Sequence, residues 1–208
     1  PVDDTHEVRF QGPNVAPGYI GPKGLRPIDL DDDGFLRTGD LARARHEGAP
    51  EEGLCFDGRI AEDFKLTTGT RVKVGALRHT LLAACAPYLQ DVAIAGSARD
   101  RVAVILFPTP AARDALDPEA LDSHMLASLA RHNTALPGSS TSIYRAIIAG
   151  DPPDREAGEI TDKGHLAQAR CLKNRATLVD QLYAFPVAAT VLCPDNATTL
   201  QEPPEASP

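Results

Sequence analysis

The sequence predicts an α+β fold, in which a small β subdomain precedes a compact domain that has a three-stranded sheet flanked by helices. Up to about residue 58, the 208-residue chain is rich in Gly, Pro and Asp, with short apolar runs between turns. This texture is typical of small β units. From about residue 60, apolar runs of strand length alternate with stretches of helical periodicity. We therefore expect domains at 1–59 and 60–183, followed by a tail at 184–208.

Within residues 1–59, the sequence predicts short strands separated by turns. Residues 7–10 alternate between polar and apolar side chains, as a half-buried strand does. The run Asp-Asp-Asp-Gly at 31–34 predicts a tight turn, and a short strand follows at 35–37. Residues 53–58 predict another short strand, which a glycine ends. Such a unit is too slight to form a good core by itself.

The second domain is expected to begin with a hairpin and a helix. Residues 64–66 and 71–74 flank Thr-Thr-Gly-Thr, which is turn chemistry, and together they resemble a hairpin with Gly69 in its loop. Apolar residues recur at helical spacing over 75–88. Pro87 lies near the end of this stretch and favours a stop there.

The remaining elements complete the predicted sheet and its helices. Apolar runs at 92–96 and 102–107 predict two buried strands, and 142–149 is the third strand candidate. An aspartate followed by a proline predicts the start of a helix over 117–132. Leu166 to Tyr183 is expected to be a last amphipathic helix. Residues 184–208 hold five of the chain's 18 prolines, so we expect a disordered tail.

The composition allows an ordinary core and disfavours some partners. Hydrophobic residues make up 42% of the chain and charged residues 24%, as in soluble globular domains. The formal net charge is −8 and no Lys/Arg run occurs, which argues against nucleic acid. No stretch approaches the roughly 18 apolar residues of a membrane span, and no signal pattern opens the chain. The four cysteines show no CxxC pairing. We therefore expect reduced thiols, no metal site and a cytoplasmic location.

Two segments of the first domain could carry chemistry. Residues 12–19 (GPNVAPGY) form a Gly/Pro loop, which alone is most simply a surface turn. Residues 33–40 (DGFLRTGD) place Asp40 just after a Thr-Gly turn. A carboxylate held there can accept hydrogen bonds from two adjacent hydroxyls, such as a ribose diol. The structural alternative is that Asp40 only caps the turn.

Two further segments follow at and beyond the predicted domain boundary. In residues 56–69 (FDGRIAEDFKLTTG), Arg59 offers donors suited to ribose or phosphate oxygens, and Gly69 would let backbone approach a ligand closely. In residues 158–164 (GEITDKG), Lys163 lies on a Gly-flanked loop. Such a lysine can stabilise charge that builds on phosphoryl oxygens. The plainer alternatives are a surface salt bridge, a turn glycine and a solvated lysine.

The order of these four segments resembles the later core motifs of the acyl-adenylate-forming (AMP-binding) superfamily. Within it, residues 58–66 and 158–164 are most similar to the feruloyl-CoA synthase branch, and 92–96 and the helix that runs to Tyr183 also resemble it. The resemblance covers roughly residues 5–183. It implies that 1–59 is the distal β subdomain of a large adenylating domain and that 60–183 is its C-terminal lid domain.

The resemblance also implies roles for individual residues in nucleotide chemistry. Thr38 and Asp40 match the Thr-Gly-Asp that binds the AMP ribose, so Asp40 would hold the ribose hydroxyls. Arg59 would assist at the nucleotide and mark the domain boundary. Lys163 matches the lysine that catalyses adenylation.

Other positions would serve the movement of the lid. Ala61 stands where many relatives have an Asp or Lys as the hinge pivot, and a small residue can still absorb the change in backbone angles. Gly69 lies in the hairpin that lines the pantetheine tunnel of the family. Relatives often carry an aromatic residue where Arg71 stands.

The implied reaction is that of an acid–thiol (CoA) ligase. A carboxylic acid and ATP would give acyl-AMP, and the thiol of CoA would then displace AMP. ATP or AMP, CoA and magnesium are the implied ligands. The family's phosphate loop, acyl pocket and magnesium-binding Glu precede these motifs, and we find no such segment here. We therefore expect the N-terminal adenylation domain to be missing and the chain to be inactive alone.

Two other functions remain open on the sequence. The chain could be a stand-alone, non-catalytic module that binds a nucleotide, CoA or a protein partner. It could also be the lid of another adenylating enzyme, of the peptide-synthetase or reductase type. No carrier-domain serine motif follows Lys163, but carriers can lie on other chains.

Overall fold

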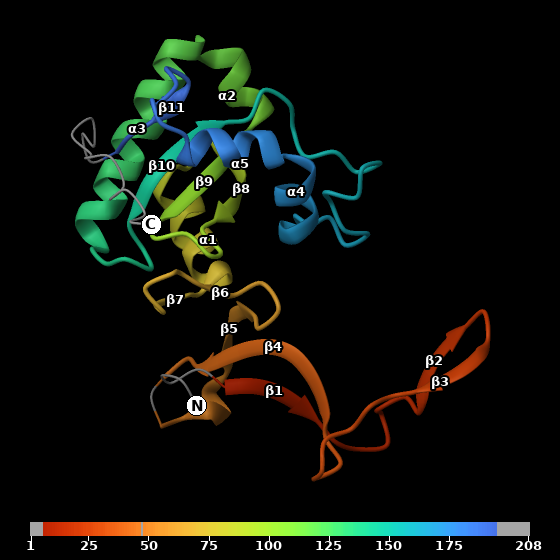
Figure 1. Ribbon diagram of the computed structural model, residues 1–208. Helices are drawn as coiled ribbons and strands as arrows, with labels where there is room; N and C mark the ends of the chain where they lie inside the picture. The colour runs from red at the N-terminus through yellow and green to blue at the C-terminus, as the bar shows by residue number, and fades with distance from the viewer. Residues whose placement is uncertain (1–5, 47, 195–208) are drawn as a thin grey trace, which may run out of the picture. The chain divides into compact units, whose positions relative to one another are not determined.

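The computed structural model of the chain describes residues 6–46 and 48–194, and it confirms the α+β class (Figure 1). The chain divides into two compact units, Pro1–Asp63 and Phe64–Pro208. The elements of the first unit are β1 (His6–Phe10), β2 (Gly18–Gly21), β3 (Gly24–Pro27), β4 (Leu36–Ala44), the 3-10 helix η1 (Pro50–Glu52) and β5 (Leu54–Arg59). The elements of the second unit are β6 (Phe64–Lys65), β7 (Arg71–Val72), α1 (Val74–Ala84), β8 (Leu89–Ala95), β9 (Val102–Pro108), α2 (Pro110–Ala115), α3 (Pro118–Ala135), β10 (Ile143–Ile148), α4 (Gln168–Asn174), α5 (Ala176–Tyr183) and β11 (Val191–Leu192).

The first unit is a three-stranded antiparallel sheet in the order β1-β4-β5, with the separate hairpin β2-β3. The predicted tight turn is present: the Gly34 N–H donates to the Asp31 carbonyl at 2.9 Å, and Gly34 has a φ of +80°. β4 is nine residues long, much longer than the strand predicted at 35–37. Among the described residues of this unit, Leu41 and Ala42 are the only buried hydrophobic side chains. The core of this unit is therefore as slight as the sequence predicts.

The second unit contains a four-stranded sheet in the order β11-β10-β9-β8. β8 and β9 are antiparallel, β9 and β10 are parallel, and β11 runs antiparallel to β10. The prediction of three strands was wrong, because Val191–Leu192 adds an edge strand by pairing with Ala146 and Ile147. The predicted tail therefore does not begin at residue 184, since Val191 and Leu192 are buried. Residues 195–208 of that tail lie outside the described residues.

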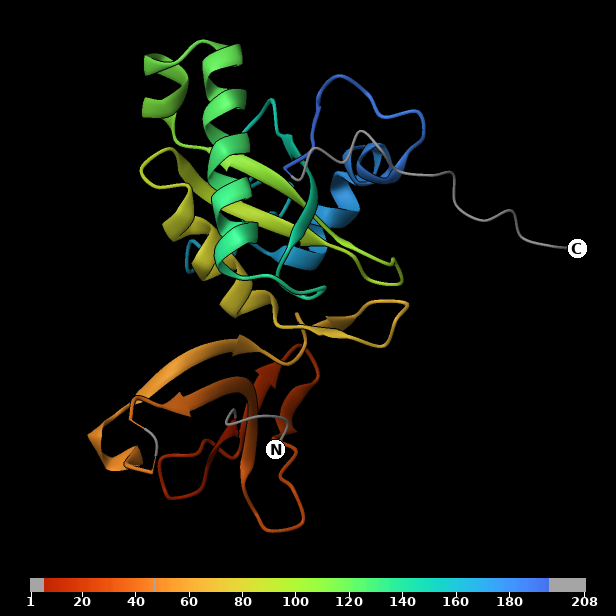
Figure 2. The same ribbon diagram turned by 90° about the vertical axis from the view of Figure 1, so that its left-hand side faces the viewer.

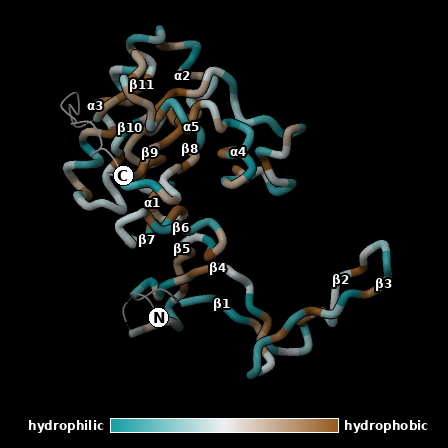
Figure 3. The backbone as a smooth tube through the Cα atoms, in the orientation of Figure 1, coloured by the Kyte–Doolittle hydropathy of each residue, from teal (hydrophilic) through white to brown (hydrophobic). Residues whose placement is uncertain are grey.

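Helices cover both faces of this sheet (Figure 2). The central strand β9 contributes side chains to the core on each face. Val102, Val104 and Leu106 belong to a core cluster with α1 and α3, whereas Ile105 and Phe107 belong to a second cluster with α4 and α5. Side chains alternate between the two faces of a strand. A strand that is buried on both faces therefore reads as one continuous apolar run, as β9 does in Figure 3.

The start of α3 follows a local capping signal in the sequence, whereas the break between α4 and α5 has no such signal. The Oδ1 atom of Asp117 accepts a hydrogen bond from the Ala120 N–H at 2.8 Å, so the predicted N-cap is present. The helix expected over 166–183 is instead two helices, α4 and α5, which meet at Arg175. We find none of the described helices long and apolar enough to cross a membrane.

Candidate functional site

Thr38, Gly39 and Asp40 lie within β4 and not in the turn that the sequence predicts, at a bulge where the pairing of β4 with β1 shifts register. Hydrogen bonds with β1 hold this bulge. The Thr38 hydroxyl donates to the Val8 carbonyl at 2.7 Å and accepts from the Asp40 N–H at 3.0 Å. The Gly39 N–H donates to Glu7 Oε1 at 3.2 Å, and Gly39 has a φ of +72°, which glycine adopts without steric cost. The backbone that carries the Asp40 carboxylate is therefore fixed by three hydrogen bonds.

Glu7, in β1, also holds this bulge, a role that the sequence did not reveal. Arg37 donates to Glu7 Oε2 from Nε at 2.9 Å, and its Nη2 atom lies 2.8 Å from the same oxygen. The hydrogen bond from Arg37 lowers the pKa of Glu7, and the Gly39 N–H and the charges of Arg37 and Arg9 lower it further, against the opposing effect of burial. Glu7 therefore stays ionised and keeps its hydrogen bond to the bulge.

Asp40 and Arg59 face each other across β4 and β5. They are register partners, and Arg59 Nε lies 3.0 Å from Asp40 Oδ1. This oxygen is shielded from solvent and accepts no well-aligned hydrogen bond from the described residues, so the contact with Arg59 is an ion pair only. The Asp40 side chain is 35% exposed, and it stands beside a largely exposed guanidinium.

The predicted hairpin is present as β6 and β7, with Phe64 paired to Val72. Gly69 closes its turn: the Gly69 N–H donates to the Leu66 carbonyl at 2.9 Å, and φ is +83°. No atom lies within 4 Å of the place where a Cβ would stand, so the turn is open on that side. Ala61 is exposed, in the turn that follows β5 and close to the boundary between the two units.

Lys163 is exposed at the tip of a loop in the second unit. Ile160 and Leu166 form a backbone bridge that closes the loop. At the tip, the Gly164 N–H donates to the Thr161 carbonyl at 2.8 Å, with a φ of +83° at Gly164. No carboxylate of the described residues forms an ion pair with Lys163. The Lys163 side chain is therefore exposed to solvent and forms no ion pair with these residues.

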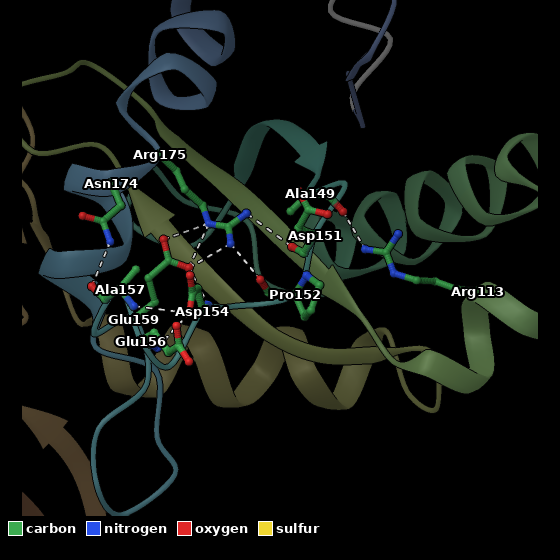
Figure 4. A network of polar contacts seen from close by, with 10 residues as sticks. All are labelled: Arg113, Ala149, Asp151, Pro152, Asp154, Glu156, Ala157, Glu159, Asn174 and Arg175. Atoms are coloured by element: carbon green, nitrogen blue, oxygen red, sulfur yellow. Dashed lines mark hydrogen bonds and ion pairs between the residues drawn. The ribbon is translucent and has the colours of Figure 1, made fainter.

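A buried ion pair lies at the start of this loop, as Figure 4 shows. Glu159 is 2% exposed, and it accepts two parallel hydrogen bonds from Arg175, from Nε to Oε1 at 3.1 Å and from Nη2 to Oε2 at 2.8 Å. The Asp154 N–H also donates to Oε2, at 2.9 Å. Arg175 donates further to the Pro152 carbonyl at 2.8 Å, and its guanidinium lies 4.9 Å from the ring centre of Phe107.

This network determines the charge state of both partners. Burial acts to raise the pKa of Glu159, but the hydrogen bonds from Arg175 and Asp154 and the charge of Arg175 outweigh it, so the pKa lies below its ordinary value. Burial acts to lower the pKa of Arg175, and the hydrogen bond and charge of Glu159 outweigh it, so that pKa is raised. Both residues are therefore charged over the ordinary range of pH.

A second buried polar residue lies at the end of the loop. Gln168 is 4% exposed. Its amide accepts from the Ile94 N–H at 3.2 Å and donates to the Ile94 carbonyl, and Arg78 Nη2 donates to its Oε1 atom at 2.9 Å. β8 is an edge strand, so Gln168 satisfies backbone groups that no neighbouring strand pairs.

The predicted site residues are divided between the two units, and two of those in the first unit are in contact. Thr38, Asp40, Arg59 and Ala61 lie in the first unit, where Asp40 and Arg59 are in contact. Gly69 and Lys163 lie in the second unit. The roles of Glu159 and Gln168 were missed, because their partners are distant in sequence. Among the described residues, no group of three or more His, Cys, Asp or Glu could hold a metal ion. The expectation that magnesium is bound outside this chain stays a prediction.

Known proteins resemble this chain over most of its described length. The family model for the AMP-binding enzyme C-terminal domain matches residues 63–185. A carboxylic acid reductase from Mycobacterium marinum is 30% identical over 179 residues, which is 85% of this chain and 15% of the reductase. An acyl-CoA ligase from Cordyceps militaris is 31% identical over 94 residues, or 45% of this chain and 14% of the ligase.

Among solved structures, the A-PCP didomain of a carboxylic acid reductase from Segniliparus rugosus, in complex with AMP, is similar with a TM-score of 0.67. It is 25% identical, and the match covers 86% of this chain and 25% of that chain. The chain thus spans about 15% of the length of the curated reductase that it matches. The similarity extends through both units, since it covers more of the chain than residues 63–185.

Proposed function

This chain belongs to the AMP-binding enzyme C-terminal domain family, and on that premise we propose that it is the C-terminal portion of an ATP-dependent, acid-activating enzyme. In this proposal, residues 60–183 are the lid domain and Lys163 is its adenylation lysine. The observation that carries the proposal is the presentation of Lys163: an exposed ammonium, which no carboxylate of the described residues pairs, at the tip of a loop that begins and ends at buried polar contacts.

The proposed reaction needs a positive charge where negative charge develops. The acid's carboxylate attacks the α-phosphorus of ATP, the bond to the bridging oxygen of pyrophosphate breaks, and acyl-AMP and pyrophosphate form. Charge builds on the phosphoryl oxygens during this step, and a cation held near them stabilises the transition state. Lys163 would supply that charge.

The nucleotide would be held by the first unit. We assign the ribose hydroxyls to Asp40, because its partly exposed carboxylate can accept two hydrogen bonds and stands on a bulge of β4 that three hydrogen bonds fix. Thr38 maintains the bulge, and Arg59 is adjacent to Asp40 and offers further donors. Ala61 is proposed as the hinge residue, close to the boundary of the two units.

The acceptor of the acyl group distinguishes two candidate enzymes. Carboxylic acid reductases match 85% of the chain, whereas the acyl-CoA ligase matches 45%. We therefore propose a reductase-type adenylation domain, which would pass its acyl group to a carrier-bound thiol. The second candidate is a feruloyl-CoA synthase-like CoA ligase, which the motifs at 58–66 and 158–164 favour. In either enzyme, the Gly69 hairpin would line the path of the thiol.

Lys163→Ala tests the adenylation role in the enzyme that contains this chain. We expect ATP–pyrophosphate exchange to fall by roughly 10²- to 10³-fold, as when one transition-state donor is removed. Thioester formation from supplied acyl-AMP should persist. Lys173→Ala is the matched control, because Lys173 is an exposed lysine in α4. Equal loss of both half-reactions would contradict the proposed role.

The acceptor is tested by supplying acyl-AMP together with free CoA or with a phosphopantetheinylated carrier domain. A reductase-type enzyme should acylate the carrier and leave CoA unreacted, as intact-mass measurement would show. Acylation of CoA alone would favour the CoA ligase. Two results together would instead favour a non-catalytic binding module. The 208-residue chain would bind AMP or CoA in calorimetry, and the Lys163→Ala enzyme would keep the wild-type rate of ATP–pyrophosphate exchange.

A further inference from the structure

We propose that Glu159, together with Arg175, and Gln168 are positioning residues that hold the two ends of the lysine loop, defined here as residues 159–168. The inference rests on the proposed function, because it concerns how Lys163 is presented. None of the three residues is expected to touch the substrate. They act through the backbone that carries Lys163.

The first end of the loop is held by charge and by shape. Arg175 and the Glu159 carboxylate meet through two parallel hydrogen bonds, the arrangement that fixes orientation as well as distance. Arg175 stands at the break between α4 and α5 and also donates to the Pro152 carbonyl. One guanidinium thus joins the loop, the two helices and the segment that leaves β10.

The second end of the loop is held to the sheet. Gln168 pairs with both backbone groups of Ile94 in β8, as a neighbouring strand would. Leu166, two residues earlier, is 4% exposed and packs in the core cluster with α4 and α5. The two ends also meet directly, because the Ala167 N–H donates to the Glu159 carbonyl at 2.8 Å.

The tip between these ends has no such attachment. Residues 161–165 are exposed, and the hydrogen bonds that they form among the described residues stay within the tip, between Thr161 and Gly164 or His165. The position of Lys163 is therefore determined by the two ends. A misplacement of about 1 Å, even from a change far from the reacting atoms, can slow a reaction by about 10²-fold.

The pairing of Glu159 has a second effect on Lys163. Glu159 lies four residues before the lysine, and its carboxylate is fully engaged by Arg175 and Asp154. It is therefore directed into the protein and does not compete with phosphate for the ammonium. A paired and buried glutamate at this place gives the loop rigidity without neutralising its charge.

Hydrogen exchange on the 208-residue chain tests the holding of the loop without reference to activity. Glu159→Gln keeps the size of the side chain and removes its charge. We expect faster exchange at the amides of Thr161, Gly164 and Ala167, beyond the change in α3 that the lower global stability causes. Glu156→Gln is the matched control, since Glu156 is exposed and forms no ion pair with the described residues. Unchanged exchange in the loop of Glu159→Gln would overturn the inference.

The two half-reactions of the complete enzyme test the consequence for catalysis. Glu159→Gln should slow ATP–pyrophosphate exchange by about 10²-fold, and transfer from supplied acyl-AMP should stay within about twofold of wild type. Gln168→Met releases the other end of the loop and should show the same split, which keeps the test available if Glu159→Gln does not fold. Equal slowing of both half-reactions would overturn the inference. ATP–pyrophosphate exchange at the wild-type rate in both variants would overturn it as well.

Lys163→Ala separates this outcome from failure of the proposed function. If Lys163→Ala retains adenylation, the proposed function itself is wrong. If Lys163→Ala loses adenylation while Glu159→Gln and Gln168→Met retain it, the proposed function stands and only the positioning role is wrong.

Discussion

At the scale of single residues, two glutamates perform similar tasks in the two units. Glu7 is bound by Arg37 and accepts from the Gly39 N–H, beside Asp40. Glu159 is bound by Arg175 and accepts from the Asp154 N–H, at the start of the lysine loop. In each case an arginine keeps the carboxylate ionised, and the carboxylate fixes the backbone near a proposed functional side chain.

The lowered pKa of Glu159 predicts that its contribution to stability is lost in acid. A carboxyl group whose pKa is lower in the folded than in the unfolded chain stabilises the fold above its ordinary pKa, here 4.5, and loses this effect as the pH falls through the folded value. At pH 7, Glu159→Gln should lower the free energy of unfolding by about 3 kcal/mol, because Arg175 loses its partner.

Urea unfolding of wild type and Glu159→Gln between pH 7 and pH 3 would measure this effect. The difference in unfolding free energy should stay constant down to about pH 5 and shrink below it. Glu156→Gln should differ little from wild type at every pH. A difference between wild type and Glu159→Gln that does not change with pH would contradict the prediction.

At the scale of elements, strands and helix starts were predictable where the determinants are local. Residues 102–107 read as a buried strand because both faces of β9 are covered. Asp117 and Pro118 predicted the start of α3 because an N-cap needs only an acceptor three residues before an amide. The β2-β3 hairpin was missed because its strands, Gly18–Gly21 and Gly24–Pro27, are too short and too exposed to show alternation.

The ends of the lysine loop could not be predicted because their partners are distant in sequence. The helical periodicity of residues 166–183 contains no sign of the break at Arg175, which coincides with a contact to Glu159 16 residues earlier. Gln168 meets Ile94, which is 74 residues earlier. Val191–Leu192 has only two residues, and it is a strand only because it pairs with β10.

Loss of the N-cap of α3 should lower stability modestly, and a substitute that can still cap the helix should restore it. Asp117→Ala removes the acceptor for the Ala120 N–H and should lower the free energy of unfolding by about 1 kcal/mol. Asp117→Asn retains an acceptor of similar capping strength and should stay close to wild type. Denaturant unfolding followed by circular dichroism would measure both variants. Equal losses in the two variants would show that the cap is not the cause.

At the scale of the whole molecule, the buried apolar side chains are divided unequally between the two units. Leu41 and Ala42 are buried in the described part of the first unit, whereas both faces of the four-stranded sheet carry a core in the second. Hydrophobic burial is the main favourable term in folding. The second unit therefore has the means to fold by itself, and the first has few.

Separate expression of the two units would test this division. Residues 64–194 should show one cooperative denaturant transition by circular dichroism. Residues 6–63 should show a gradual, non-cooperative change, because a unit of this size with so slight a core is marginal. A cooperative transition in 6–63, or its absence in 64–194, would contradict the prediction.

The contact between Arg175 and the lysine loop has a consequence for the construction of chimaeric enzymes. A graft that replaced residues 158–168 with those of a relative would leave Arg175 in its helix break, opposite whatever residue takes the place of Glu159. Unless that residue is also a glutamate, the foreign loop would keep its lysine and lose the hold on its first end. The smallest transferable segment is therefore 152–175, which carries both members of the pair and the carbonyl of Pro152.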